Sequence, residues 1–265
     1  MTELQILGLT RFAYPGLGGF QTEHDSVAAR QAHLWAPARL EARLRSFGRV
    51  TLAGLRAQTD PGFRLLVVTG ADLPEPWRGR LAGLVAGLPQ AELVFHPPEN
   101  PRDAMARLVA DRIDPKGPPT MQFRMDDDDG VAVDFVERAR AAFAGARGVF
   151  RREGRLCIDF NRGYMLRLDP PAVAPAVRAA LGVAQAIVQR PQARRTALHY
   201  PHHRLPQLMP CLSLTDAPMW LRGLDGHNDS GAGARVALRP PDAAQRAELA
   251  DRFALDPEAI AGGAA

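Results

Sequence analysis

The chain has 265 residues, of which 46% are hydrophobic and 23% are charged, as in ordinary soluble globular proteins. Its formal net charge of +4 comes without the basic run that nucleic-acid binders carry, so we expect no nucleic-acid partner. No stretch approaches the ~18 unbroken apolar residues of a membrane span. The N-terminus also lacks the basic segment of a signal peptide. We expect a cytoplasmic protein with at most peripheral membrane association.

Apolar runs alternate with helical patterns through the first half of the chain. We expect strands over 4–9, 63–69, 91–95 and 120–125, and helices over 39–58, 76–88, 102–112 and 133–144, with a break near Gly48. Strands that alternate with helices predict a mostly parallel central sheet flanked by helices on both faces. The fold class is therefore α/β.

The second half is patterned differently. We expect antiparallel strands within 149–168, a helix over 172–189, loops that line a site over 199–233, and a last helix over 241–253. Cys157 and Cys211 are the two cysteines, too few for a disulfide framework or a thiolate metal site. We expect both to be reduced.

Four consecutive aspartates, 126–129, are the most distinctive feature of the sequence. They repel one another, and holding them together costs stability unless a cation offsets their charge. They follow a predicted parallel strand, at the edge where open α/β sheets bind ligands. Carboxylate oxygens are the ligands that Mg²⁺ or Mn²⁺ takes, so we expect a site for one of these ions rather than a solvated charge run.

Two enzyme classes place Asp-x-Asp at such a strand end. One is the GT-A glycosyltransferases, which hold a metal on the diphosphate of a nucleotide sugar. The other is the haloacid-dehalogenase-like phosphatases, which need a downstream lysine, whereas Lys116 is the only lysine here and precedes the run. A third hypothesis is a non-catalytic protein that binds a nucleotide sugar or a divalent cation.

Histidines of the second half are further candidates. His227 could complete the coordination of the metal, since a neutral imidazole binds divalent ions, or could lie in a loop exposed to solvent. His199, His202 and His203 form a cluster whose spacing is not that of a zinc site. This cluster could supply a general base, bind acceptor hydroxyls or have a structural role.

Several segments together resemble the rhamnosyltransferase family of bacteria, within the GT-A glycosyltransferases. They are Arg11-Phe12, Gly18-Gly19-Phe20, residues 58–64, residues 123–129, His202-His203 through Pro210, and residues 227–230. The resemblance implies one glycosyltransferase domain over 1–265. Its parts are a nucleotide-sugar-binding half (1–130), an acceptor half (131–240), and a C-terminal helix and tail (241–265).

The resemblance also implies roles for residues. The donor is expected to be a nucleotide sugar, with dTDP-L-rhamnose as the suggested one, and the acceptor a glycan or small molecule. Asp126 and Asp128 would hold Mn²⁺ or Mg²⁺, which stabilises the diphosphate leaving group. The donor would also contact Thr10, Arg11, Arg124 and Asp127. If the reaction inverts, a base must take the acceptor proton, and His203, His202 and Asp216 are the open candidates.

Overall fold

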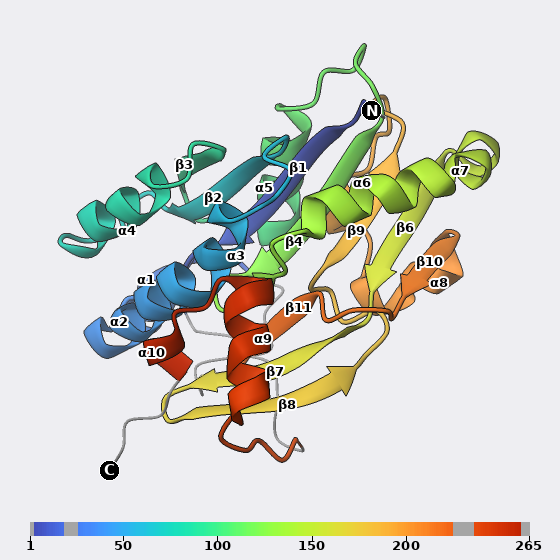
Figure 1. Ribbon diagram of the computed structural model, residues 1–265. Helices are drawn as coiled ribbons and strands as arrows, with labels where there is room; N and C mark the ends of the chain where they lie inside the picture. Colours follow the sequence, from blue (N-terminus) through green and yellow to red (C-terminus); the bar gives the residue numbers. More distant parts are fainter. Residues whose placement is uncertain (1–2, 19–25, 225–235, 261–265) are drawn as a thin grey trace.

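A seven-stranded sheet forms the centre of the protein (Figure 1). The computed structural model describes residues 3–18, 26–224 and 236–260, and every structural statement below refers to these ranges. In spatial order the strands are β10 (Cys211–Leu214), β6 (Arg155–Phe160), β9 (Gln185–Gln189), β4 (Thr120–Asp126), β1 (Gln5–Arg11), β2 (Arg64–Gly70) and β3 (Ala91–His96). All neighbouring pairs are parallel except the two that β9 makes. The predicted α/β class and mostly parallel sheet are confirmed.

Helices cover both faces of this sheet (Figure 1). The helices of the described ranges are α1 (Val27–Leu34), α2 (Pro37–Ser46), the π-helical η1 (Phe47–Thr51), α3 (Leu52–Arg56), α4 (Trp77–Ala86), α5 (Pro101–Ala110), α6 (Phe135–Gly145), α7 (Arg147–Glu153), the short 3-10 turns η2 (Ala197–His199) and η3 (His202–Arg204), α8 (Leu205–Leu208), α9 (Ala243–Phe253) and α10 (Pro257–Ile260). The predicted break near Gly48 is the π-helical segment η1, a form that often interrupts α-helices.

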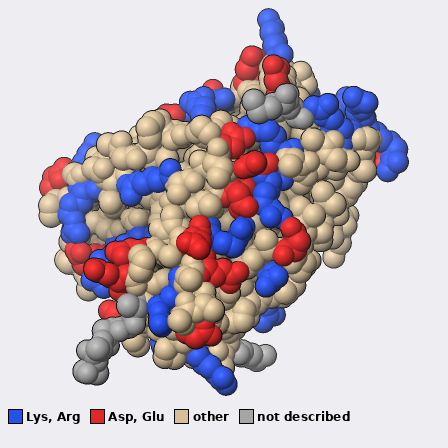
Figure 2. All heavy atoms as spheres, in the orientation of Figure 1, with Lys and Arg blue, Asp and Glu red and all other residues tan. Residues whose placement is uncertain are grey.

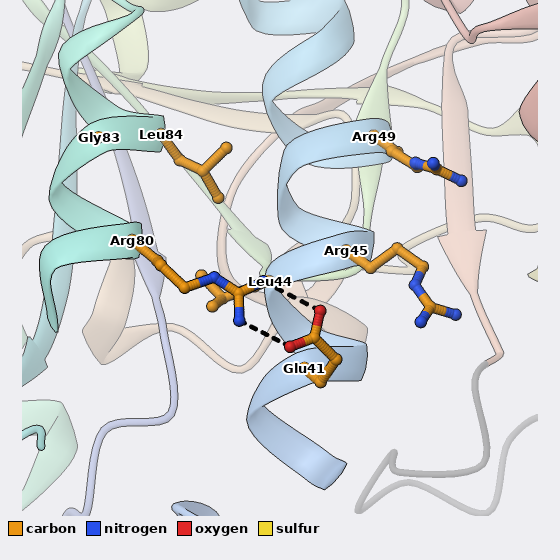
Figure 3. A pocket seen from close by; sticks show the side chains of 7 residues that line it. All are labelled: Glu41, Leu44, Arg45, Arg49, Arg80, Gly83 and Leu84. Carbon is orange, nitrogen blue, oxygen red and sulfur yellow. Dashed lines mark hydrogen bonds and ion pairs between the residues drawn. The ribbon is translucent and has the colours of Figure 1, made fainter. Parts of the chain in front are cut away.

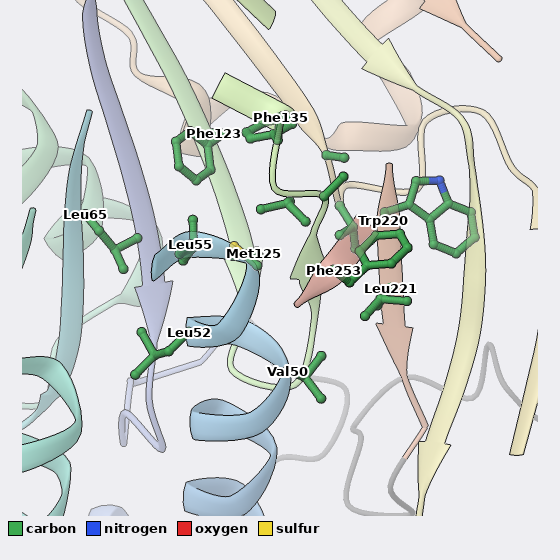
Figure 4. Packing of buried hydrophobic residues seen from close by; sticks show 14 of the residues in the cluster. Val50, Leu52, Leu55, Leu65, Phe123, Met125, Phe135, Trp220, Leu221 and Phe253 are labelled. Atoms are coloured by element: carbon green, nitrogen blue, oxygen red, sulfur yellow. The ribbon is translucent and has the colours of Figure 1, made fainter. Parts of the chain in front are cut away.

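Side-chain alternation along β2 shows how the two faces are filled. Leu65 and Val67 belong to the large core under α2, α3, α4 and α6, whereas Leu66 and Val68 belong to a smaller core under α5. Figure 4 shows part of the large core, where Leu55 of α3 and Phe123 of β4 belong to the same cluster as Phe253 of α9. A cavity lies at the carboxyl ends of β1 and β4, on the face of the sheet that α5 covers.

A second, smaller sheet lies beside the first. It has the order β5 (Gly130–Val131), β11 (Trp220–Gly223), β7 (Arg162–Leu168) and β8 (Pro171–Val177). Its antiparallel pairs are β5 with β11 and β7 with β8. Trp220 is fully buried beneath it and joins this sheet to the large core. The two-residue strand β5 directly follows the aspartate run, so this sheet fixes the far end of that run.

Two predictions for the second half were wrong. Residues 149–153 belong to helix α7, and β6 does not pair with β7, because the chain crosses from one sheet to the other at Asn161. Residues 172–189 form β8 and β9 rather than a helix. The alanine-rich composition of this segment favours a helix locally, but pairing with β7, β4 and β6 decides its structure.

Charged side chains are spread over the surface (Figure 2). Acidic and basic groups are interspersed on the face shown, and basic groups gather over α7, where Arg147, Arg151 and Arg152 are exposed. Within the described ranges, no helix combines the length and the apolar character needed to cross a bilayer.

Candidate active site

The aspartate run forms a tight turn at the carboxyl end of β4. The backbone N–H of Asp129 donates to the carbonyl of Asp126 at 3.2 Å, and Asp129 Oδ2 accepts from the N–H of Asp126 at 3.4 Å. This turn interrupts the side-chain alternation of a strand and brings Asp129 back beside Asp126. Asp126 is half exposed, whereas Asp127, Asp128 and Asp129 are buried.

Arg43 of α2 holds one side of this turn. Its Nη1 donates to Asp127 Oδ1 at 2.8 Å and lies 3.3 Å from Asp128 Oδ2. The Arg43 side chain is only 9% exposed, so its ion pairs are weakly screened by solvent. Breaking a buried pair of this kind leaves an uncompensated charge in the interior.

Arg222 of β11 holds the other side. Its Nη1 lies 2.8 Å from Asp129 Oδ2 and 3.1 Å from Asp126 Oδ2. The next residue, Gly223, donates its N–H to Asp129 Oδ1 at 3.3 Å. A Cβ at Gly223 would lie 2.4 Å from the carbonyl oxygen of Asp128, so glycine is required for this approach. The aspartate turn is therefore fixed by residues from both halves of the chain.

The carboxyl groups of Asp126, Asp128 and Asp129 differ in their electrostatics. Although half of its side chain is exposed, Asp126 is partly desolvated by the surrounding turn, which would raise its pKa, but the positive charges of Arg222 and Arg11 outweigh this effect and lower the pKa. Burial and the negative charge of Asp129 raise the pKa of Asp128 well above its ordinary value. Burial also raises the pKa of Asp129 to about 7, against the opposing effect of Arg222. Asp128 and Asp129 therefore hold a proton more tightly than an ordinary aspartate does.

A cavity of about 700 Å³ opens beside the turn, on the α5 face of the sheet. Its charged lining residues include Arg11, Arg102, Arg124, Asp126, Asp129 and Arg222. Arg11 Nη2 lies 4.0 Å from Asp126 Oδ1, and Arg124 Nη2 donates to the carbonyl of Tyr200 at 3.4 Å. Burial and the neighbouring Arg11 lower the pKa of Arg124. Guanidinium groups around a carboxylate pair suit a ligand that carries phosphates and a cation together.

Of the three proposed bases, His202 is the one that lines this cavity. Its Nδ1 lies 2.7 Å from the carbonyl oxygen of Ala180, so the proton on Nδ1 is donated there and Nε2 is the acceptor nitrogen. Burial lowers the pKa of His202, and the hydrogen bond to Ala180 opposes this effect. The neutral form is thus favoured near neutral pH.

Other predicted residues lie elsewhere. Thr10 is buried on the opposite face of β1 from Leu9 and Arg11, which line the cavity. Asp127 is engaged by Arg43 and does not line the cavity. His203 is exposed, with its ring edge-on to His202 at 5.4 Å.

Asp216 and His227 are the two remaining residues predicted for the site. Asp216 is exposed and accepts a hydrogen bond from Arg138 of α6, away from the cavity. His227, the predicted third metal ligand, lies outside the described residues. His199, which belongs to the same sequence cluster as His202 and His203, has a structural role. Its Nδ1 accepts a hydrogen bond from the N–H of Thr196 at 3.1 Å within a capping box.

Arg43, Arg102 and Arg222 were not predicted from the sequence, and Asp129 belongs to the predicted acidic run but was not among the predicted ligands. Asp129 could have been found, because a turn after a strand brings residues i and i+3 together. The three arginines carry no local signal, since nearly every basic residue of the chain is an arginine. Only the fold brings these three to the cavity and the turn.

A second cavity, of about 460 Å³, lies between α2–η1 and α4 (Figure 3). Its charged lining residues are Glu41, Arg45, Arg49 and Arg80, and Arg80 donates to both carboxylate oxygens of Glu41. None of the four aspartates lines this groove. The larger cavity, where carboxylates and several arginines meet, is therefore the candidate active site.

The mostly parallel sheet, with β9 as an antiparallel strand, and the aspartate turn after β4 agree with the arrangement that the resemblance to GT-A glycosyltransferases predicts. The chain belongs to the family described as "Putative rhamnosyl transferase", which matches residues 5–236. The resemblance noted from the sequence is confirmed. No curated protein sequence matches the chain.

Solved structures of S. aureus TarS are similar at low identity. The crystal structure of TarS 1-349 has 12% identity and a TM-score of 0.44, with 83% of this chain and 60% of that chain covered. TarS 1-349 in complex with UDP-GlcNAc has 11% identity and a TM-score of 0.45, with 96% and 69% covered. The chain thus spans 60% of the length of the first of these, and such low identity does not indicate a shared substrate.

Proposed function

We propose that this protein transfers a sugar from a nucleoside-diphosphate donor to a glycan or small-molecule acceptor, with a divalent cation at the aspartate turn. The observation that carries the proposal is the cavity in which Asp126 and Asp129 meet Arg11, Arg124 and Arg222. Its volume of about 700 Å³ is of the size that small-molecule and cofactor sites have. The family description suggests a rhamnosyl group as the transferred sugar, and we propose dTDP-L-rhamnose as the donor to test.

The chemistry of the aspartate turn fits Mn²⁺ or Mg²⁺. Carboxylate oxygens of Asp126, Asp128 and Asp129 lie within 4.8 Å of one another. Asp128 Oδ2 is buried and accepts no hydrogen bond, although Arg43 Nη1 lies 3.3 Å from it. A buried carboxylate oxygen that accepts no hydrogen bond is costly, and a hard cation would add to the compensation that Arg43 provides. Asp126 and Asp128 remain the proposed ligands, with Asp129 added.

The arginines account for the rest of donor binding. When bound, the cation would act as a Lewis acid on the diphosphate. Arg11 and Arg124 lie on the same wall as Asp126 and can donate charge-assisted hydrogen bonds to phosphate oxygens. Negative charge grows on the diphosphate as the bond between sugar and phosphate breaks, so these donors stabilise the transition state more than the ground state.

His202 is the base that the geometry favours. Its Nε2 is the acceptor nitrogen, and its ring lines the same cavity as Arg222 and Asp129. In an inverting reaction Nε2 would take the proton of the acceptor hydroxyl while the hydroxyl oxygen attacks the sugar. His203 and Asp216 do not line this cavity in the described structure.

A binding and transfer panel tests the proposal. UDP-, GDP- and dTDP-sugars, including dTDP-L-rhamnose, are added with and without Mn²⁺, and melting temperature and calorimetric affinity are measured. We expect Mn²⁺-dependent binding of one nucleotide class, followed by sugar transfer detected by mass spectrometry. Hydrolysis of simple phosphate esters would favour the phosphatase hypothesis. Binding with no transfer to any acceptor would favour the non-catalytic one.

Asp128→Ala gives the sharper test of the metal. It removes one of several like charges, so the fold should survive and its stability should not fall. Mn²⁺-dependent binding of a nucleoside diphosphate should be lost in the calorimeter. Unchanged metal-dependent affinity in this variant would contradict the assignment of the cation to this turn.

A further inference from the structure

The loop between β8 and β9 has an unusual backbone. Ala180, Gly182 and Ala184 have φ angles of 55°, 97° and 48°, in the left-handed region that alanine rarely adopts. Leu181 and Gly182 line the candidate active site. Because the local sequence disfavours this conformation, tertiary contacts must hold it, and such backbone is common where a site has to be positioned.

Asp159 of β6 supplies one of these contacts. Its side chain is buried, and both carboxylate oxygens accept hydrogen bonds. Oδ2 accepts from the N–H of Ala180 at 2.8 Å, and Oδ1 accepts from Gln185 Nε2 at 3.1 Å. Gln185 is the first residue of β9. Asp159 of β6 therefore fixes two points of the loop, Ala180 and Gln185, relative to the central sheet.

The same loop holds His202. The carbonyl of Ala180 accepts from His202 Nδ1 at 2.7 Å, so Ala180 bonds to Asp159 through its N–H and to His202 through its C=O. The imidazole also packs on Gly182, where a Cβ would lie 3.2 Å from His202 Cγ. The orientation and tautomer of His202 therefore depend on where this loop lies.

We propose that Asp159 is a positioning residue for glycosyl transfer, acting through Ala180 to keep the proton on His202 Nδ1 and leave Nε2 free to act as base. This inference rests on the proposed function. In the step it serves, the O–H bond of the acceptor breaks and its proton goes to Nε2. The acceptor oxygen bonds to the anomeric carbon, and the sugar–phosphate bond breaks with its electron pair leaving on the diphosphate.

The charges that face His202 come from several elements. Arg124 of β4, His203 of η3 and Arg222 of β11 all lower the pKa of His202, as does its burial. The hydrogen bond to Ala180 raises it. Asp159 is the nearby acidic group, and the charge of His202 in turn lowers the pKa of Asp159, which burial raises. Loss of the Asp159 charge and loosening of the Ala180 contact should therefore both lower the pKa of His202.

Asp159→Asn tests the proposal, with Asp60→Asn as the matched control. Asp60 also accepts from a backbone N–H, of Gly62 at 2.8 Å, and from a side chain, Arg140 Nε at 2.7 Å, but it does not line the cavity. For Asp159→Asn we expect kcat to fall by roughly 10- to 100-fold, part of the 10²–10⁴ that a general base contributes. The KM for the nucleotide sugar should stay within about twofold, and the acid limb of the kcat/KM profile should move to lower pH.

A second readout does not depend on activity. Nitrogen NMR of the His202 ring should show the Nδ1–H tautomer in the wild type and a mixture of tautomers in Asp159→Asn. If no donor or acceptor supports transfer, the proposed function fails and this measurement still decides the positioning role. An unchanged tautomer in Asp159→Asn, an unchanged kcat and pH profile, or losses equal to those of Asp60→Asn would overturn the proposal. Gly182→Ala provides an independent variant if Asp159→Asn does not fold.

Discussion

The two walls of the cavity are built by different means. The acidic wall, Asp126–Asp129, is a single short turn whose shape depends on counter-ions, with Arg43 on one side and Arg222 on the other. The histidine wall, Ala180–Gly182 with His202, depends on hydrogen bonds to a strained backbone, one of them accepted by the buried carboxylate of Asp159. Charge balance holds one wall and backbone geometry holds the other, so different substitutions should weaken each of them.

Arg43→Met should have the largest effect and acts on the acidic wall. It removes the guanidinium that lies 2.8 Å from Asp127 Oδ1 and 3.3 Å from Asp128 Oδ2, and breaking a buried pair costs about 3–5 kcal/mol. The free energy of unfolding, measured with urea, should fall by that amount. Arg45→Met on the same helix is the control, because Arg45 is 46% exposed and lies 3.7 Å from Asp169. Equal unfolding midpoints for the two variants would show that counter-ions do not hold this wall.

The acidic wall should also make stability depend on pH. The pKa of Asp129 is raised to about 7, so the folded protein keeps a proton that the unfolded chain has lost above its ordinary range of ~4. The stability that Asp129 contributes is complete below that range and is lost as pH rises through about 7. For one proton the slope is about 1.4 kcal/mol per pH unit.

Asp129→Asn gives the comparison for this pH effect. In EDTA, the wild type should lose stability relative to Asp129→Asn as pH rises from 5 to 8, as measured by thermal melts. Parallel curves for the two proteins would mean that Asp129 ionises normally. Added Mn²⁺ should reduce the wild-type loss, because a cation stabilises the ionised form.

Gly182→Ala acts on the histidine wall and should have a smaller effect. Its φ of 97° is unfavourable for alanine, and the new Cβ would crowd His202, so we expect a loss of about 1–2 kcal/mol. Turnover should fall, whereas Mn²⁺-dependent donor binding should persist, because the acidic wall is untouched. Gly83→Ala in α4 is the control: no atom lies within 4 Å of its added Cβ, and alanine favours a helix. Loss of donor binding in Gly182→Ala would show that donor binding depends on the histidine wall as well as on the acidic wall.

Glu41→Gln should have the smallest effect, since it belongs to neither wall. It removes the ion pair with Arg80 in the groove of Figure 3, where both side chains are about 45% exposed. Exposed ion pairs contribute little to stability. The melting temperature and the donor affinity should match those of the wild type. A loss of donor affinity in this variant would indicate that the groove takes part in binding.

The sequence predicts the parallel half of the fold well. The strands that became β1, β2, β3 and β4 are apolar runs bounded by turn residues, and α2 and α5 between them are amphipathic helices. The aspartate run is also a local feature of the sequence. Its position at the end of β4 follows from the strand predicted over 120–125. The histidine wall is harder to predict, because the alanines of 172–189 favour a helix locally. Pairing with the preceding strand β7 makes β8, and pairing with the more distant β4 and β6 makes β9.

The arginines of the site could not be predicted from the sequence. Arg43 faces Asp127 because of where α2 packs, and Arg222 faces Asp129 because β11 adds to the second sheet. Neither position differs from the many other arginines of the chain in its local sequence. Ion pairs between distant segments become visible only when the fold is known.

The two arginine contacts that hold the aspartate turn also influence the order of folding. The contacts of Arg43 with Asp127 and of Arg222 with Asp129 close loops of 84 and 93 residues, on opposite sides of the turn. Contacts so far apart in sequence form late, because loop closure costs entropy before they contribute. During synthesis Arg43 emerges before the turn and Arg222 long after it, so Asp129 lacks its Arg222 contact until the second sheet assembles. A fragment ending before Arg222 should therefore contain an aspartate turn that is held by Arg43 but not by Arg222.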